Sequence, residues 1–352
     1  MRILHILNEV REIGNGIVNV TVDLACLQAE NGYEVMVVSG GGEYEVLLNK
    51  YGVEHFKLDQ SRTPGNIIKA IWSYRAIVRE FQPDIVHAHM MTGIILAKFW
   101  QPFFKYSLVS TVHNEFQRSA SVMGLADRVI AVSSAVGESM NRRGISAEKI
   151  RVIRNGTLGS VRTKSLEEYQ PMELLRPAIS TVAGMYKRKG ITELIAAFTE
   201  IADEFTDANL YLVGNGPDRE MFEEQARNTA VKDKIHFVGF QPEPQRYLLS
   251  TDIFVLASHK EPFGLVISEA REAGCAIIAS DVDGIPEAVD AGEAGILVPP
   301  VNSNALAEVL KRLLANPEEL QKWQQKAKTN LESLSVQRVH EENIEIYKEL
   351  ID

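Results

Sequence analysis

The sequence is poor in cysteine and in long apolar runs. Cysteine occurs only twice among the 352 residues, as Cys26 and Cys275, and both stand in apolar, helix-like surroundings. We expect two buried free thiols, because nothing in this spacing indicates a disulfide framework. No apolar run approaches the roughly 18 residues of a membrane-spanning helix. The opening residues Met1–Leu7 are typical of a strand and too few for the core of a signal peptide. These absences predict a cytoplasmic protein.

Basic charge is also scarce, and it is unevenly spread. The formal net charge is −10; residues 1–160 carry 17 basic and 15 acidic side chains, whereas residues 161–352 carry 20 and 32. The acidic second half argues against a nucleic-acid partner, since phosphate backbones select basic surfaces. The near-neutral first half leaves open peripheral contact with the inner face of the cytoplasmic membrane. Its segment Phe99–Tyr106 is aromatic and basic, as interfacial segments are, although packing of these aromatics on the domain's own core is the commoner arrangement.

Short β-branched runs alternate with longer helical stretches throughout. This alternation predicts an α/β fold with parallel sheets covered by helices on both faces. The length exceeds the roughly 250–300 residues at which single cores stop growing, so two domains are expected. The predicted strands of the first half are Ile3–Leu7, Glu34–Val38, Glu54–Leu58, Ile85–His89, Leu108–Val112, Arg128–Val132 and Arg151–Ile153. Those of the second half are Ile179–Val182, Leu210–Val213, Ile235–Val238, Ile253–Leu256, Ala276–Ala279 and Ile296–Val298.

The periodicity fades between Asn155 and Pro177, which marks an interdomain linker. We therefore assign residues 1–160 to a first Rossmann-like domain, 161–177 to the linker and 178–335 to a second doubly wound domain. A last helix at about 336–352 carries large apolar residues and is predicted to pack back on the first domain. Sheets of this kind bind ligands outside the carboxyl ends of their strands, so two facing domains would make a cleft.

The strongest local signal is a pair of glutamates, Glu261 and Glu269, that follows a strand. Pro262 and Gly264 break the chain between this strand and a helix that begins near Leu265. The free N–H groups of a helix start are an anion site suited to a diphosphate. Carboxylates beside it accept hydrogen bonds from sugar hydroxyls. Glutamates eight residues apart are common on ordinary helices, so the spacing is informative only because of this context.

Several motifs in order resemble those of one enzyme family. The Glu261–Glu269 segment resembles the glutamate–seven residues–glutamate motif of retaining glycosyltransferases with the GT-B fold, family four. Four further segments resemble family motifs in the same order: Asp84–His89, Val152–Gly156, Leu212–Pro217 and Ser280–Glu287. The resemblance implies two facing Rossmann-like domains and transfer of a sugar from a nucleotide-diphosphate sugar, with the second domain holding the donor and the first admitting a glycan or lipid-linked acceptor.

The resemblance also implies roles for residues of the second domain. Glu261 would lie beside the donor sugar as a candidate catalytic residue, and Glu269 would hold the ribose. Backbone groups of Phe263, Gly264, Leu265 and Val266 would bind the diphosphate, and those of Phe240 and Gln241 the base. The family's Gly-Arg…Lys-Gly loop is matched by Lys189 and Gly190, but Met185 stands where we align the arginine. We expect Lys189 to bind phosphate and Arg188 to supply the missing guanidinium.

In the first domain the resemblance singles out Gly16 and His113. Gly16 lies in the loop after the first strand, where the family approaches the donor, and a dinucleotide fingerprint is absent because Asn19 replaces its third glycine. His113 ends a strand and would lie beside the donor sugar, although a lone histidine there is commonly structural. His87 and His89 share one strand face, and we interpret them as structural or acceptor-side, because no third metal ligand is evident.

We expect no metal and no cofactor beyond the nucleotide-sugar co-substrate. Asp281 and Asp283 spell a metal-binding triplet of another glycosyltransferase fold, but the family resembled here holds the diphosphate with cations and helix ends. The resemblance therefore implies a metal-independent, retaining glycosyltransferase. Alternatives are a nucleotide-sugar epimerase or a phosphorylase on the same fold, and a non-catalytic sugar-nucleotide binding protein. A dehydrogenase is disfavoured by the absent fingerprint.

Overall fold

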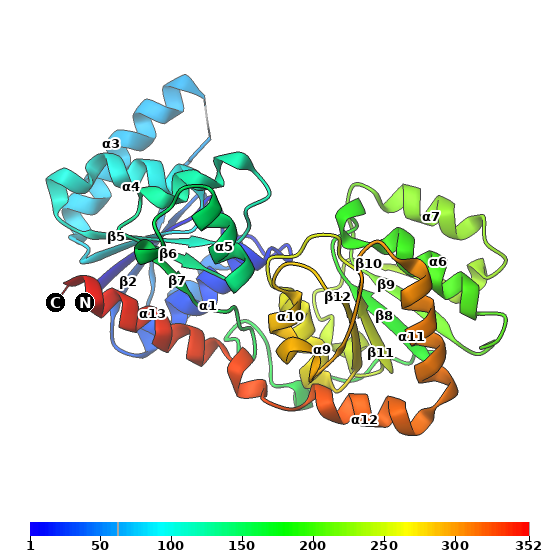
Figure 1. Cartoon of the computed structure of the whole chain (residues 1–352). Helices are drawn as coiled ribbons and strands as arrows, with labels where there is room; N and C mark the ends of the chain where they lie inside the picture. Colours follow the sequence, from blue (N-terminus) through cyan, green and yellow to red (C-terminus); the bar gives the residue numbers. More distant parts are fainter. Residues whose placement is uncertain (62, 352) are drawn as a thin grey trace. The chain divides into compact units, whose positions relative to one another are not determined.

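The computed structural model describes residues 1–61 and 63–351 and divides into two compact units (Figure 1). Unit 1 comprises Met1–Thr163 together with the C-terminal segment from Ser335, and unit 2 comprises Lys164–Leu334. The structure thus assigns most of the segment 161–177 to unit 2. Both cysteines are free and buried, as expected. Among the described residues, no helix combines the length and apolar character needed to cross a bilayer.

Unit 1 is built on a seven-stranded parallel sheet in the order β3-β2-β1-β4-β5-β6-β7. Its strands are β1 (Arg2–Ile6), β2 (Glu34–Ser39), β3 (Glu54–Lys57), β4 (Ile85–Ala88), β5 (Ser107–Val112), β6 (Arg128–Ala131) and β7 (Ile150–Val152). Its α-helices are α1 (Gly16–Glu30), α2 (Glu45–Lys50), α3 (Pro64–Phe81), α4 (Met91–Phe104), α5 (Ser134–Arg142) and α13 (Val336–Ile351). The central strands are buried on both faces, which explains their nearly continuous apolar sequence.

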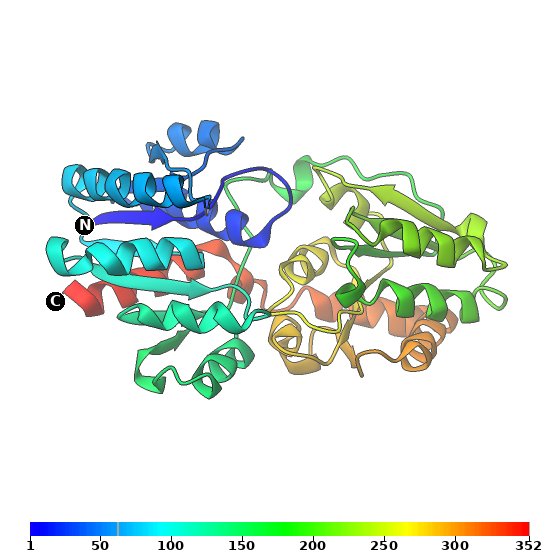
Figure 2. The ribbon, with the colours of Figure 1, turned by 90° about the horizontal axis from the view of Figure 1, so that it is seen from above.

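Alternate residues of one strand serve the two faces of the unit-1 sheet. Leu4 and Ile6 of β1 pack with the cluster that contains α3 and α4, which lie side by side in Figures 1 and 2. Ile3 packs with α13 on the opposite face, through Ile344 and Tyr347. His5 shares the face of Ile3, because successive strand side chains alternate. The first and last helices of the unit therefore cover the same face, and they contact each other.

Unit 2 contains a six-stranded parallel sheet in the order β10-β9-β8-β11-β12-β13. Its strands are β8 (Ala178–Val182), β9 (Asn209–Val213), β10 (Ile235–Gly239), β11 (Ile253–Leu256), β12 (Ala276–Ser280) and β13 (Ile296–Val298). Its α-helices are α6 (Ile191–Ile201), α7 (Arg219–Arg227), α8 (Gln245–Leu248), α9 (Leu265–Ala273), α10 (Ile285–Ala288), α11 (Ser303–Ala315) and α12 (Pro317–Ala327). All the predicted strands of both units are present, with ends that differ by at most one residue.

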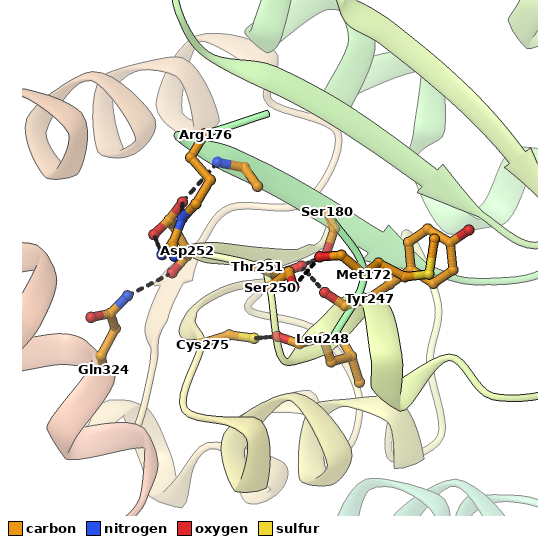
Figure 3. A network of polar contacts seen from close by, with 11 residues as sticks. Met172, Arg176, Ser180, Tyr247, Leu248, Ser250, Thr251, Asp252, Cys275 and Gln324 are labelled. Atoms are coloured by element: carbon orange, nitrogen blue, oxygen red, sulfur yellow. Dashed lines mark hydrogen bonds and ion pairs between the residues drawn. The ribbon is translucent and has the colours of Figure 1, made fainter. Parts of the chain in front are cut away.

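A polar network closes the amino edge of the unit-2 sheet (Figure 3). Asp252, just before β11, accepts hydrogen bonds from Arg176 Nε at 3.1 Å and from the backbone N–H of Ala178 at 2.8 Å. Beside it, Thr251 Oγ1 lies 2.8 Å from Ser180 Oγ. The network anchors the segment that enters β8 at the amino edge. The loops that carry the sequence motifs lie at the opposite edge, after the carboxyl ends of the strands.

Candidate functional site

The carboxyl edge of the unit-2 sheet has one point where the strand order reverses. The chain runs outward from β8 to β9 and β10, then returns to the other side of β8 with β11, so the loops after β8 and β11 diverge there. Such a reversal leaves a crevice in which doubly wound sheets bind ligands. The loop after β8 carries Arg188 and Lys189, and the loop after β11 carries Glu261. Topology alone therefore brings two separate sequence motifs to one place.

Lys189 and Glu261 form an ion pair at this point. Lys189 Nζ donates a hydrogen bond to Glu261 Oε2, and both side chains are mostly buried. The same Oε2 accepts from Ser258 Oγ at 3.3 Å. A partly desolvated ammonium beside an accepting carboxylate can bind an anionic phosphate and a sugar hydroxyl at adjacent positions.

The backbone of Glu261 is held by residues that follow β12. Its N–H donates to Asp283 Oδ2 at 2.9 Å, and its carbonyl accepts from the N–H of Gly284 at 3.1 Å. Asp283 therefore braces the loop that presents Glu261. Sequence reasoning placed Asp283 in a metal triplet and in the family-like segment Ser280–Glu287. It missed this bracing role because the contact joins residues from two different loops.

Close backbone approach explains the glycine after Lys189. Gly190 has φ +67°, and a Cβ at this position would lie 1.8 Å from the carbonyl oxygen of Ala257. Only glycine fits such an approach. The loops after β8 and β11 are thus packed backbone to backbone, which sets the spacing of Lys189 and Glu261.

The helix that follows Glu261 begins as an uncapped helix. Gly264 is the N-cap of α9, with φ +89° and no side-chain cap. The N–H groups at its start lack intrahelical partners and carry the positive end of the helix dipole. Phe263 has its side chain buried, so it offers only backbone groups. Leu265, Val266 and Glu269 are partly exposed on the first turns of α9.

Met185 stands at the position that we align with the family's arginine. Its side chain is fully buried in the unit-2 core, so this position does not face a ligand. The Arg188 guanidinium lies over the ring of Tyr186, 5.4 Å from the centroid. A Cβ on Gly184 would meet the same ring at 2.9 Å, so Tyr186 and Arg188 fill the space beside this glycine. Sequence reasoning missed Tyr186.

The residues predicted to bind the base lie farther along the same edge. Phe240 and Gln241 directly follow β10, two strands away from β8, and therefore about 10 Å from it. The Phe240 ring is exposed and Gln241 is partly exposed. No described contact joins them to Lys189 or Glu261, so they form a separate part of the same edge.

In unit 1 the structure gathers four histidines from three adjacent strands. His5 lies on β1, His87 on β4, His89 just after β4 and His113 just after β5. His5 and His87 are paired in register, and one ring nitrogen from each of His5, His87 and His89 lies within 4.8 Å of the other two. The sequence interpretation found no third histidine for the His87 and His89 pair. His5 is that residue, and its strand register was the missing information.

Burial keeps these imidazoles neutral. Desolvation lowers the pKa of His5 to about 4, against a hydrogen bond from His5 to the Gln28 amide oxygen that raises it, and lowers the pKa of His113 to about 3. The pKa values of His87 and His89 are lowered well below their usual range, again mainly by burial. His113 is the most exposed of the four.

Gly16 is the first residue of α1 and directly follows Asn15. The Asn15 side chain caps the helix by accepting a hydrogen bond from the Ile17 N–H at 3.0 Å.

Two family models match almost the whole chain. Residues 14–157 match the model described as Glycosyltransferase Family 4, and residues 173–330 match Glycosyl transferases group 1. A glycogen synthase of Mycobacterium tuberculosis is 28% identical over 280 residues, which are 72% of this chain and 66% of that protein. The lipopolysaccharide core biosynthesis glycosyltransferase LpsD of Rhizobium meliloti is 26% identical over 70% of this chain and 69% of its own length.

A solved structure shares the complete architecture. HepE of Anabaena, crystallised in complex with UDP-glucose, superposes with a TM-score of 0.84 over 99% of this chain and 100% of its own, at 18% identity. At this identity the likeness concerns the fold. Each of the two parallel sheets therefore belongs to a described architecture with two Rossmann-like domains.

Proposed function

Because the chain belongs to the glycosyltransferases of family 4 and group 1, with the GT-B fold, we propose that it transfers a sugar from a nucleotide-diphosphate sugar to a hydroxyl acceptor with retained configuration. The acceptor class is a glycan, a polysaccharide or a lipid-linked precursor. The observation that carries the proposal is the Lys189–Glu261 ion pair at the switch point of the unit-2 sheet, one loop before the start of α9.

The chemistry of the pair suits departure of a nucleoside diphosphate. Negative charge grows on the leaving phosphate as the glycosidic bond breaks, and fixed positive groups stabilise that charge. Lys189, Arg188 and the N–H groups of Gly264 to Val266 supply such groups without a metal. Asp283 is already engaged by the backbone of Glu261. Glu261 positions the sugar and stabilises the developing oxocarbenium charge, while Glu269 accepts hydrogen bonds from the ribose hydroxyls.

Two variants test these assignments. Glu261→Gln removes the carboxylate charge but keeps its size, and Glu269→Ala removes the ribose acceptor. Both lower turnover, the first mainly through kcat and the second through the KM for the donor. Glu272→Ala, on the same helix, is the matched control. Near wild-type kinetics in both site variants would overturn the assignment. Turnover lost with a chelator and restored by Mg²⁺ or Mn²⁺ would overturn metal independence.

The donor is identified by binding. A ligand that binds only the folded protein raises its melting temperature, so UDP-, GDP- and ADP-sugars can be ranked by the shifts they cause. Incubation of the preferred donor with and without an acceptor then separates the reactions. Transfer with retained configuration supports the proposal. Epimerised donor in the absence of an acceptor would indicate an epimerase instead, and a reaction that needs inorganic phosphate would indicate a phosphorylase. Binding without any turnover would indicate a non-catalytic sugar-nucleotide binding protein.

An aromatic face on unit 1 suits peripheral contact with an anionic membrane. Trp100 and Tyr106 are buried, whereas Phe99 and Phe103 are 56% and 70% exposed. The segment Phe99–Tyr106 therefore divides between core and surface. On the neighbouring α3, Trp72 is 60% exposed, and the same two helices carry three exposed aliphatic residues: Ile67, Ile68 and Ile95.

Basic side chains accompany this aromatic face. Arg75 lies over the rings of Trp72 and Trp100, at 5.9 and 5.6 Å from their centroids, and Lys69 and Lys98 stand on the same two helices. Apolar rings beside cationic groups match the interfacial region of a bilayer. Cosedimentation with vesicles tests this contact: Phe103→Ser lowers binding to anionic vesicles, and Val46→Ser, an exposed apolar residue of α2, does not. Equal binding to neutral vesicles would contradict it.

A further inference from the structure

The four clustered histidines of unit 1, His5, His87, His89 and His113, form part of a continuous hydrogen-bonded relay that begins at Gln28 on α1. Gln28 Oε1 lies 2.7 Å from His5 Nε2, and His5 Nδ1 lies 3.0 Å from His89 Nε2. His89 Nδ1 in turn lies 3.0 Å from His113 Nε2. The relay runs from a fully buried amide to the carboxyl end of β5, where His113 is its most exposed member.

The first contact decides the direction of every other one. A neutral imidazole carries a proton on only one nitrogen, and an amide oxygen only accepts. His5 therefore carries its proton on Nε2, and its Nδ1 accepts from the Nε2–H of His89. His89 Nδ1 then accepts from the Nε2–H of His113. It follows that His113 Nδ1 is unprotonated and available as an acceptor.

A second branch engages the other end of the Gln28 amide. Gln28 Nε2 lies 3.5 Å from the hydroxyl of Tyr347, which lies 2.5 Å from His87 Nδ1. His87 Nε2 is 2.7 Å from Thr111 Oγ1. With the amide N–H directed at Tyr347, the tyrosine proton goes to His87 Nδ1 and the His87 Nε2–H goes to Thr111. Both ends of the amide are thus engaged, and its oxygen faces His5.

The relay also accounts for the triad of His5, His87 and His89 without an ion. All six of their ring nitrogens have hydrogen-bond partners within the two branches. A metal bound by the three would break at least two of these contacts. Burial supports the neutral state on which the relay depends, since it lowers the pKa of each imidazole.

We propose that Gln28 is a positioning residue that acts through His5 and His89 to hold His113 in the Nε2–H tautomer. His113 Nδ1 is thereby presented as a hydrogen-bond acceptor for a hydroxyl of the sugar substrate. Among the residues that the structure describes, His113 makes its hydrogen bond through Nε2 and none through Nδ1. A hydroxyl bound there places one oxygen of the sugar without transferring charge, because the imidazole stays neutral. The identity of the hydroxyl as a sugar group rests on the proposed function, whereas the tautomer does not.

The tautomer is measured directly in the full chain labelled with ¹⁵N-histidine. Two-bond ¹H–¹⁵N correlation spectra distinguish protonated from unprotonated ring nitrogens, and His113→Gln assigns the His113 signals. At pH 7 and without ligand, His113 Nε2 is expected to be protonated and Nδ1 unprotonated. A protonated Nδ1, or a cationic ring, would overturn the relay whether or not the protein turns over any substrate.

Two variants separate positioning from packing. Gln28→Met removes the amide with little change in size, so the His113 tautomers should mix and kcat/KM for the donor should fall about tenfold, as for one lost hydrogen bond. Thr111→Val removes only the last contact of the second branch, between His87 Nε2 and Thr111 Oγ1, and leaves both contacts of the Gln28 amide in place. It should therefore preserve both the His113 spectrum and kcat/KM. Equal losses in the two variants would overturn the assignment of Gln28. If Gln28→Met does not fold, the wild-type spectrum still decides the tautomer.

The hydroxyl donor is located by titration of the same His113 signals. UDP-glucose is expected to shift the Nδ1 resonance, and UDP alone is expected to leave it unchanged. A shift produced only by glucose or another free acceptor sugar would assign the contact to the acceptor instead. An unshifted Nδ1 with all three probes would overturn the sugar contact, while the ligand-free spectrum would continue to test the relay by itself.

Discussion

Lys189 Nζ donates a hydrogen bond to Glu261 Oε2, although the two residues lie 72 positions apart and follow different strands. Both side chains are mostly buried, so neither is well hydrated if its partner is removed. Removal of one member of such a pair leaves an uncompensated charge, which costs more than the pair itself contributes. Loss of either residue is therefore expected to disturb both the arrangement of the site and the binding of an anionic ligand.

Replacement of Lys189 by alanine is expected to lower kcat by about 10²–10³-fold, as for loss of one group that stabilises charge in a transition state. Lys189→Arg keeps the charge and should recover part of this loss. Lys260→Ala is the matched control, because Lys260 is adjacent to Glu261 in the chain but exposed. Steady-state kinetics with the preferred donor provide the measurement. Equal effects of Lys189→Ala and Lys260→Ala would remove Lys189 from the site.

A methyl group at Gly190 is expected to destabilise unit 2 by several kcal/mol. Its Cβ would overlap the Ala257 carbonyl at 1.8 Å, in addition to the left-handed backbone at φ +67°. Gly52→Ala has only the cost of the left-handed backbone, because φ is +75° and no atom lies within 4 Å of the added Cβ. A loss of about 1–2 kcal/mol in the free energy of unfolding is expected for this variant. Urea unfolding compares the two variants. Similar losses would show that the loops do not pack backbone to backbone.

The free energy of unfolding of unit 1 is expected to fall as the pH is lowered from about 6.5 toward 4. His5 and His113 have folded-state pKa values of about 4 and 3, below the unfolded value of 6.5. Below about pH 6.5 the unfolded chain binds protons that the folded chain does not, so stability is full above that pH and falls as the pH decreases toward the folded pKa values. Each such histidine contributes a slope of up to about 1.4 kcal/mol per pH unit.

This loss can be followed in unit 1 alone. Trp72 and Trp100 lie in unit 1 and Trp323 lies in unit 2, so Trp323→Phe leaves fluorescence that reports unit 1. Urea midpoints between pH 7.5 and 5 should decrease in this background. His113→Gln should reduce the slope, since it removes one neutral histidine. A slope unchanged by this substitution would contradict the buried neutral state of His113.

The exposed ring of Phe240 is expected to stack on the nucleotide base. Stacking of aromatic groups contributes about 0.5–1.5 kcal/mol beyond their burial, so Phe240→Ala should weaken binding of the free nucleoside diphosphate about fivefold. Phe240→Tyr keeps the ring and should bind normally. Phe56→Ala, an exposed ring of unit 1, controls for loss of surface area. Calorimetric titration measures all three, and an unchanged dissociation constant for Phe240→Ala would place the base elsewhere.

The sequence alone determined the strands, their parallel arrangement and the loops that carry the motifs. Burial on both sheet faces demands nearly continuous apolar runs, and these runs are local, so the strand ends could be read to within one residue. The Lys189 and Glu261 loops were found in the same way, since each lies between an apolar strand and a helix.

The tertiary structure decided which of these residues meet. The Lys189–Glu261 pair, the brace from Asp283 and the relay from Gln28 to His113 all join distant segments. Met185 shows the same limit, because a position aligned with a ligand-binding residue has its side chain in the core. Strand register and loop packing set these contacts. Both depend on how strands from distant parts of the chain assemble into one sheet. The local pattern of apolar residues is enough to predict the strands. The distances between their ends follow only from the order and register of the strands in the folded sheets.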